Sequence, residues 1–236
     1  MEKNNSKFSI SEAMKIYNGC DPVKQTLCLW GIVTLVFWAW ILLIKLMTGF
    51  TLGVVIETSD SETASALSRT TFTTSMFYAG AIGSVIGQIR EYYTHTAGGK
   101  YFRSVRGGFG TYSRMKAGQM IAEVCGLAFF VTVVFLINSV LHLIQGCLAI
   151  CGTVFLLSIL LLSVLKLVRW IQNQFLRISA YTFLLYMYLF MSACIVGVTN
   201  GKLSTVHIVL LILALILFPL VHFADLKHFR KYHWYD

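Results

Sequence analysis

Residues 147–165 read CLAICGTVFLLSILLLSVL, and no charged side chain interrupts them. A helix that crosses the hydrocarbon core of a bilayer, which is about 30 Å thick, needs about 20 predominantly apolar residues, because each residue adds about 1.5 Å. The quoted stretch has about this length and this composition. It therefore predicts a transmembrane helix.

Further stretches of similar length and composition occur on both sides of the quoted one. Together they make six apolar segments, approximately Leu27–Leu46, Thr70–Ile89, Met120–Leu141, Cys147–Leu165, Ile178–Val198 and Val206–Phe223. The sequence therefore predicts an all-α, polytopic integral membrane protein with about six transmembrane helices.

The segments between these spans carry Lys and Arg on alternate sides only. Sixteen of the 19 basic residues fall on one side: Lys3, Lys7, Lys15, Lys24, Arg90, Lys100, Arg103, Arg106, Arg114, Lys116, Lys166, Arg169, Arg177, Lys227, Arg230 and Lys231. Arg69 and Lys202 fall on the other side, and Lys45 lies near the outer end of the first span. Because cytoplasmic loops carry the excess of Lys and Arg, we expect both termini in the cytoplasm. The expected location is a bacterial inner (plasma) membrane.

The overall composition agrees with this class. Hydrophobic residues make up 57% of the 236 residues, charged residues make up 12%, and the mean hydropathy is +0.72, which excludes a soluble enzyme. The formal net charge of +9 could suggest nucleic acid. These charges lie at the ends of spans, however, where anionic lipid headgroups attract each of them by about 1 kcal/mol. We expect the bilayer with its anionic headgroups, and not nucleic acid, to be the partner of these charges.

The chain divides into an N-terminal cytoplasmic arm at 1–26, a six-helix transmembrane domain at 27–223 and a basic cytoplasmic tail at 224–236. Ser9 and Glu12 in the arm have the spacing of a capping box and are followed by apolar residues at helical spacing. This predicts a short amphipathic helix, either a lipid-surface anchor or a docking peptide. Asp21 and Pro22 predict the start of the first span, as N-cap and first helical residue.

The second span contains a ridge of small side chains. Its members recur every four residues: Ser75, Ala79, Gly83 and Gly87. The third span has a shorter ridge at its cytoplasmic end, consisting of Gly118, Ala122 and Gly126. Small residues let two membrane helices approach closely, so we expect both ridges to contact protein. The simplest arrangement is a tight pair of the second and third helices, with a contact between copies of the chain as the alternative.

The fourth and sixth spans contain almost nothing but Leu, Ile and Val. Helices without a small or polar stripe gain least from tight partners, so we expect both to face lipid. Tyrosines such as Tyr186 and Tyr188 in the fifth span need hydrogen-bond acceptors at membrane depth. Part of that helix should therefore face the protein interior.

Glu123 is the only carboxylate inside a span. Ionisable groups at this depth are rare and are functional candidates, so Glu123 is a possible ion or proton site. The simpler interpretation is an acid near the interface that pairs with Arg114, Lys116 or another basic group of the cytoplasmic rim.

The loop at 90–117 is the only sizeable soluble segment between spans, and it combines glycines and aromatic residues with basic side chains. We expect the basic side chains Lys100, Arg103, Arg106, Arg114 and Lys116 to dock a protein partner or a lipid surface. Arginine next to aromatic rings can also stack on nucleic-acid bases, but the loop has neither a P-loop nor a dinucleotide fingerprint.

No pattern for catalysis, metal binding or a cofactor occurs in the sequence. We therefore expect a non-enzymatic subunit of a larger membrane assembly, which contains further copies of the chain or other membrane or cytoplasmic subunits. Secretion, conjugation and defence machineries use proteins of this kind. The alternative function is a small ion channel or proton-coupled transporter that uses Glu123.

Overall fold

A computed structural model of the chain describes residues 22–48, 70–89, 108–141, 146–200 and 202–232. The regular structure in these ranges is helical: α2 (Pro22–Thr48), a helix at 70–89, α4 (Gly108–Leu141), α5 (Cys147–Val168), α6 (Gln174–Thr199) and α7 (Thr205–Tyr232). Each labelled helix is long and apolar enough to cross a membrane. The 70–89 helix coincides with the remaining predicted span. The prediction of an all-helical fold with several membrane-length helices is therefore confirmed, whereas insertion and orientation stay predictions.

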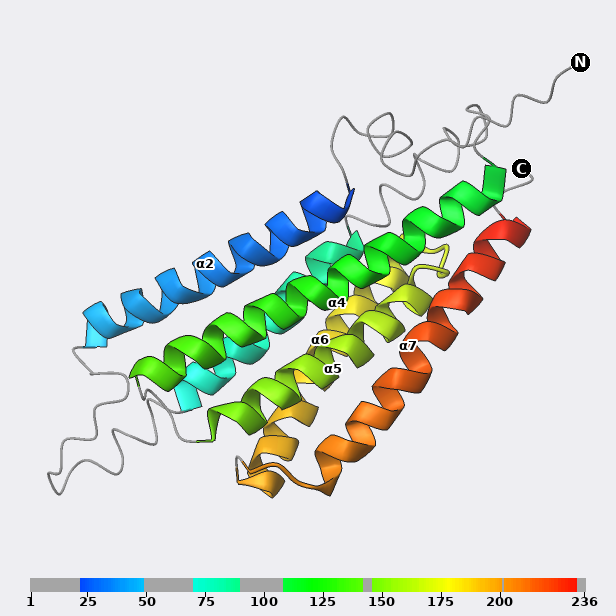
Figure 1. The fold of residues 1–236 in the computed structure, drawn as a ribbon. Coiled ribbons are helices and arrows are strands. Elements are labelled where there is room, and N and C mark those ends of the chain that lie inside the picture. Colours follow the sequence, from blue (N-terminus) through cyan, green and yellow to red (C-terminus); the bar gives the residue numbers. More distant parts are fainter. Residues whose placement is uncertain (1–21, 49–69, 90–107, 142–145, 201, 233–236) are drawn as a thin grey trace, which may run out of the picture.

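The helices lie side by side, and helices that follow one another in the sequence run in opposite directions (Figure 1). One end of the bundle therefore holds the first residues of α2, α4 and α6 and the last residues of the 70–89 helix, α5 and α7. Lys24, Arg114 and Arg230 lie in the terminal turns of α2, α4 and α7 at this end, which we call the basic end. Groups that are far apart in the sequence thereby come to the same level.

The core is built around α5 and the 70–89 helix. α5 packs against α4, α6 and α7, and α2 packs against α4. Aromatic rings fill the space between α2, the 70–89 helix and α4: Phe37 makes edge-on contacts with Phe72 and Phe130, at centroid distances of 5.5 and 5.6 Å. These three rings are buried, which adds edge-to-face attraction to the van der Waals packing that holds membrane helices together.

Local sequence explains several helix ends. The Asn173 side chain accepts hydrogen bonds from the backbone N–H groups of Phe175 and Leu176, at 2.9 and 3.3 Å, and so caps α6. Gly146 precedes α5 with a φ of 71°, a left-handed conformation that costs glycine little. Asn200, which follows α6, is also left-handed.

Three expected boundaries differ from the structure. α4 begins at Gly108, so residues 108–117 are helical and do not belong to the loop expected at 90–117. α2 begins at Pro22, which confirms the predicted first helical residue, so the arm boundary expected at 26 lies inside α2, and α7 continues to Tyr232, through most of the tail expected at 224–236. The physical reason is that packing between the ends of α4 and α7 extends both helices beyond their apolar segments. The expected amphipathic helix near Ser9 lies outside the described residues.

The expectation that the fourth span faces lipid is wrong. α5 is the most buried of the five labelled helices. In its most apolar stretch 72% of the residues are buried, against 33% in the corresponding stretch of α7. Hydroxyl and charged groups on several sides of α5 bind the neighbouring helices, so it has partners that a count of Leu, Ile and Val does not indicate. In the fifth span, Tyr188 is buried and Tyr186 is exposed, so this helix does turn part of its aromatic surface inward.

Candidate functional site

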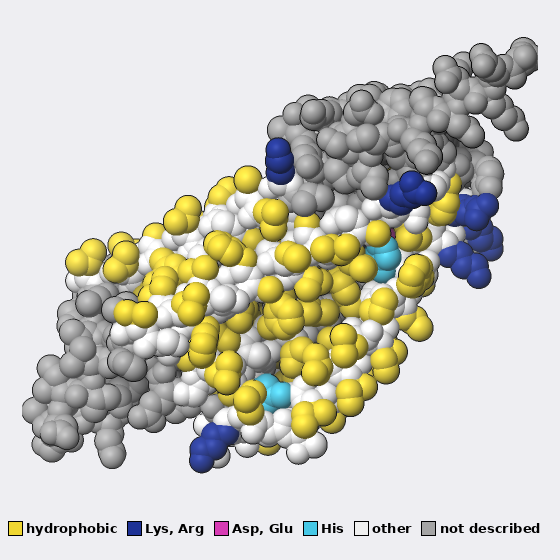
Figure 2. All heavy atoms as spheres, in the orientation of Figure 1, with side chains coloured by type: hydrophobic (Ala, Val, Ile, Leu, Met, Phe, Trp, Pro, Cys, Tyr) yellow, Lys and Arg dark blue, Asp and Glu magenta, His cyan; other side chains and the backbone are white. Residues whose placement is uncertain are grey.

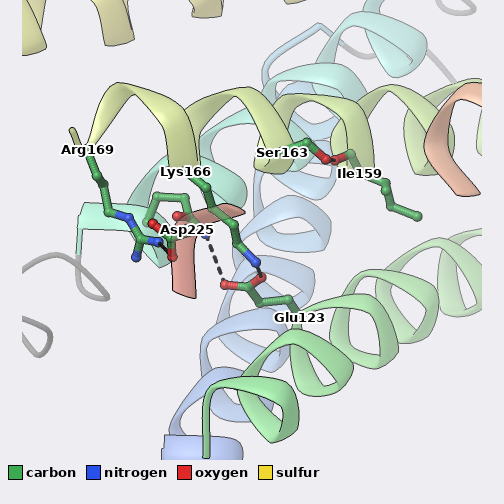
Figure 3. A network of polar contacts seen from close by, with 7 residues as sticks. Glu123, Ile159, Ser163, Lys166, Arg169 and Asp225 are labelled. Atoms are coloured by element: carbon green, nitrogen blue, oxygen red, sulfur yellow. Dashed lines mark hydrogen bonds and ion pairs between the residues drawn. The ribbon is translucent and has the colours of Figure 1, made fainter. Parts of the chain in front are cut away.

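Glu123 lies inside the bundle, near the basic end, where three helices meet. Its carboxylate is 3.3 Å from the Lys166 ammonium of α5, measured from Oε2 to Nζ (Figure 3). The Gln88 side chain, from the 70–89 helix, donates a hydrogen bond from Nε2 to Glu123 Oε1 at 3.0 Å. All three side chains are buried, so the ion pair and the hydrogen bond are shielded from solvent. Glu123 therefore joins α4, α5 and the 70–89 helix.

The antiparallel arrangement brings these groups together. Gln88 lies in the last turn of its helix and Lys166 in the last turn of α5, where the helix dipole favours a cation. Glu123 lies on α4, which runs in the opposite direction and begins at the same end. Lys166 also lies over the Phe218 ring of α7, with Nζ 4.8 Å from the centroid. One lysine therefore contacts two neighbours of α5, namely α4 and α7.

A second buried ion pair lies one turn further toward the basic end. Arg169 of α5 donates to the Asp225 carboxylate of α7, and the indole nitrogen of Trp170 donates to the other Asp225 oxygen at 3.0 Å. The Trp170 ring also stacks on His228, with centroids 4.4 Å apart. Figure 3 shows Arg169 and Lys166 side by side along α5, each directed toward its acidic partner. The two pairs fix the end of α5 to α4 on one side and to α7 on the other.

The structure specifies which basic group pairs with Glu123. We expected Arg114, Lys116 or another basic group of the rim, and the ion pair with Lys166 fits the last of these, although the sequence analysis did not name this residue as the partner. Gln88 and Asp225 were also missed. A signal for Asp225 was present, because it continues the spacing of His207, Ala214 and Phe218 along one face of the last helix. Nothing in the sequence links Lys166 to Glu123.

A small cavity adjoins the carboxylate. It is lined by Thr26, Leu29, Trp30, Gly83, Gly87, Gln119, Glu123 and Leu162, and its volume is about 10 Å³. This is roughly the room that one water molecule needs. The lining combines apolar side chains with the polar groups of Thr26, Gln119 and Glu123, so the cavity is partly polar.

The small-residue ridges lie against Trp30 of α2. A Cβ atom added to Gly83 would lie 2.9 Å from Cζ3 of Trp30, and one added to Gly126 would also overlap this indole. Both glycines thus make room for one large ring, which is only 2% exposed. We expected the small residues of the 70–89 helix and of α4 to pack directly against each other. The structure instead places the Trp30 indole of α2 beside both glycines.

The other ridge positions vary in burial. Ala122 is buried, while Ser75, Ala79, Gly87 and Gly118 are partly buried. Gly80, beside the ridge, has other neighbours: an added Cβ would lie 2.9 Å from Ser158 Oγ and 3.1 Å from the Tyr188 hydroxyl. The 70–89 helix therefore places small residues both against α2 and against α5 and α6.

The predicted docking cations fall into two groups. Lys100, Arg103 and Arg106 lie outside the described residues, whereas Arg114 and Lys116 belong to the first turns of α4. Arg114 is exposed. Lys116 is buried, with Nζ 5.7 Å from the centroid of the Tyr112 ring, and it does not present its ammonium at the surface as a docking residue would. The helical start of α4 turns this side chain inward.

Aromatic contacts join the first turns of α4 to the last turns of α7. The rings of Tyr112 and Phe229 stack with centroids 4.6 Å apart, and the Arg230 guanidinium lies 5.2 Å from the centroid of Phe109. Figure 2 shows hydrophobic atoms over the sides of the bundle and groups of Lys and Arg atoms where α4 begins and α7 ends. The two helices therefore form a paired extension that carries positive charge.

Across the described helices, no group of three or more His, Cys, Asp or Glu side chains could hold a metal ion. The arrangement supplies instead two buried ion pairs, a polar cavity and an exposed basic surface. No family model, curated protein or solved structure matches the chain.

Proposed function

We propose that the protein is a non-enzymatic, multi-pass membrane subunit of a larger assembly, which binds an acidic partner surface through its basic end. The observation that carries this proposal is how the charges of the described residues are distributed. Their two carboxylates, Glu123 and Asp225, are buried and paired with Lys166 and Arg169. Exposed cations remain at the basic end, among them Arg114, Lys227 and Arg230.

The internal pairing and the external charge have different roles in this proposal. Buried ion pairs fix which helix faces meet, and they leave the carboxylates no charge to offer a partner. The exposed cations lie on two helices that aromatic rings hold together, so they are positioned before a partner arrives. Charges arranged in this way favour fast association with acidic surfaces and set the orientation of the partner. The apolar sides of the bundle would face lipid or further subunits.

The test is recovery of partners from native membranes in mild detergent, with the full chain as bait. A double variant, Arg114→Gln with Arg230→Gln, should lose several-fold more partner than the wild type, and increasing salt should reduce recovery in the same way. Lys202→Gln is the matched control, because Lys202 is an exposed cation at the opposite end. Equal loss in the control, or a wild-type chain that purifies as a salt-independent monomer without partners, contradicts the proposal.

The second candidate function is a small ion channel or proton-coupled transporter. One observation favours it: the buried Glu123 lines a polar cavity inside the bundle, and ionisable groups in such places mark ion and proton pathways. Purified protein in liposomes should then conduct ions or protons without any partner, and Glu123→Gln should abolish or alter the flux while the protein stays folded. Flux that depends on Glu123 would replace the assembly proposal, and its absence together with Arg114- and Arg230-dependent partner recovery would exclude the transporter.

A further inference from the structure

The cavity beside Glu123 contains a polar group that the ion pairs do not explain. The Gln119 side chain is only 5% exposed, it lines the cavity, and its Oε1 atom has no hydrogen-bond partner in the structure. A buried amide oxygen without a donor is costly, so groups of this kind are nearly always satisfied by protein or by ordered water. Gln119 and Glu123 are separated by one helical turn on α4, so both face the same cavity.

We propose that this cavity is the binding site of one water molecule, which donates a hydrogen bond to Gln119 and links it to Glu123. The volume of about 10 Å³ is roughly that required for a single water. A buried water needs two to four polar partners, and the lining provides Gln119, the Glu123 carboxylate and the Thr26 hydroxyl, which can accept a hydrogen bond in addition to those it makes.

Charge decides against a metal cation in the same place. Lys166 already lies 3.3 Å from the Glu123 carboxylate and neutralises it. An added cation would leave a net positive charge in the interior, whereas water supplies donors without charge. An apolar occupant would fill the space and leave Gln119 without a donor. Water is the one small ligand that meets all three conditions of size, hydrogen bonding and charge.

The bound water would extend the polar network across the bundle. The 70–89 helix reaches Glu123 through Gln88, and α5 reaches it through Lys166. The water would connect the same carboxylate to Gln119 and to Thr26 of α2. Four helices would then meet at one hydrated carboxylate. This inference is independent of the proposed assembly function, since it concerns the interior of the bundle.

The direct test is an experimental structure of the full chain in lipid nanodiscs, at a resolution that shows ordered water. We expect one water about 2.8 Å from Gln119 Oε1, which is absent from the structure of Gln119→Met. An empty cavity in a map that resolves other buried waters would overturn the proposal, as would a metal ion identified by anomalous scattering. If Gln119→Met does not fold, the wild-type map alone decides.

The change in thermal stability of cavity variants is an independent test, because a hydrated and a dry cavity predict changes of opposite sign. Gly87 lines the cavity, and a Cβ added there would lie 3.7 Å from Leu29 Cδ2, an ordinary contact, so alanine fits but takes the space of the water. Gln119→Met should lower the thermal unfolding midpoint by about 3 °C, because the acceptor of the water is lost. Gly87→Ala should unfold about 3 °C below a glycine-to-alanine variant elsewhere in the bundle, because the water is displaced.

The matched control is Gly152→Ala on α5, whose added Cβ would also lie 3.7 Å from its nearest neighbour, a His207 ring carbon, and which is not among the residues that line the cavity. It should not lower the midpoint, because alanine favours helix over glycine. In a dry cavity Gly87→Ala would fill a void and Gln119→Met would remove an unsatisfied oxygen, so both would raise the midpoint. A rise in Gln119→Met, or a midpoint of Gly87→Ala at or above that of Gly152→Ala, therefore contradicts the bound water.

Discussion

α5 and α7 have similar compositions, rich in Leu, Ile and Val, but they occupy opposite environments. α5 lies at the centre, in contact with α4, α6 and α7, while much of α7 is exposed along its length. The difference lies in the direction of the few polar groups. Those of α5 point to different neighbours: Thr153 to His207 of α7, Ser158 to Tyr188 of α6 and Lys166 to Glu123 of α4.

The buried polar groups of α7 lie on one face. His207 and Asp225 belong to a buried stripe with Leu210, Ala214, Phe218 and Val221, at spacings of three and four residues. Between Ile208 and Phe223 the opposite face is apolar and exposed, as a lipid-facing surface would be. For membrane helices, the angular distribution of polar residues is therefore a better guide to position than the amount of Leu, Ile and Val.

The largest expected effect comes from removing a charged partner of α5. Lys166→Met would leave the Glu123 carboxylate buried without its cation, which typically costs about 3–5 kcal/mol. Unfolding of the purified protein in mild detergent measures this loss. Adding Glu123→Gln to Lys166→Met should restore much of the stability, because neither position of the pair then carries a charge. A single variant as stable as the wild type would mean that the pair does not hold α5 at the centre.

The next effect compares the same substitution in the two helices. Leu162 of α5 is 1% exposed, whereas Leu215 of α7 is 66% exposed. Leu162→Ala should cost about 2–5 kcal/mol, because it opens a cavity in the core. Leu215→Ala should change stability by less than about 0.5 kcal/mol, since the lost side chain faced outward. Equal losses at the two sites in the same unfolding assay would remove the contrast between the helices.

A smaller effect is expected from the hydrogen bond between α5 and α6. The Ser158 and Tyr188 hydroxyls are 3.0 Å apart and buried. Ser158→Ala and Tyr188→Phe should each cost about 1 kcal/mol, and the double variant should cost less than their sum, because both remove one interaction. Thr182→Ala is the control, since the Thr182 hydroxyl bonds only within its own helix in the described contacts, to the Ile178 carbonyl at 3.1 Å. Strict additivity in the double-mutant cycle would show that the two hydroxyls do not interact.

The smallest effect is expected on the outer face of α7. Leu211 is exposed, so Leu211→Phe should be nearly neutral in the unfolding measurement, within about 0.5 kcal/mol. The informative exception would be a variant that stays folded but loses partners in the membrane pull-down. That result would identify the outer face of α7 as a protein interface within the proposed assembly.

Much of the fold could be predicted from the sequence because hydrophobic length is a local property. The expected segment Cys147–Leu165 corresponds to α5 (Cys147–Val168), and Leu27–Leu46 lies within α2 (Pro22–Thr48). Boundaries were less accurate where helices continue beyond the apolar stretch. Residues 108–117 looked like a loop because of their glycines and cations, yet their aromatic rings pack against α7 and keep them helical.

The candidate site could be predicted only in part. Glu123 was identifiable because a carboxylate among apolar residues is conspicuous, and the glycines at 83 and 126 indicated close approach of another group. The residues that they contact could not be identified, because Lys166 is 43 residues from Glu123 in the sequence and Trp30 lies on a different span from both glycines. Arg169 was assigned only to the basic side of the membrane and Asp225 lay within the expected tail, so their ion pair was not predicted.

The sequence by itself determined that this chain forms a set of apolar helices, where each one lies along the chain and which few residues are unusual at that depth. Those properties depend on the length and hydropathy of each segment, which are local and do not require knowledge of the other segments. Only the tertiary structure decided that α5 is central, that Trp30 lies against both glycines and that Glu123 pairs with Lys166 beside a cavity. These outcomes depend on how helix faces meet, because lipid is as apolar as leucine and only specific packing and polar contacts distinguish one neighbour from another.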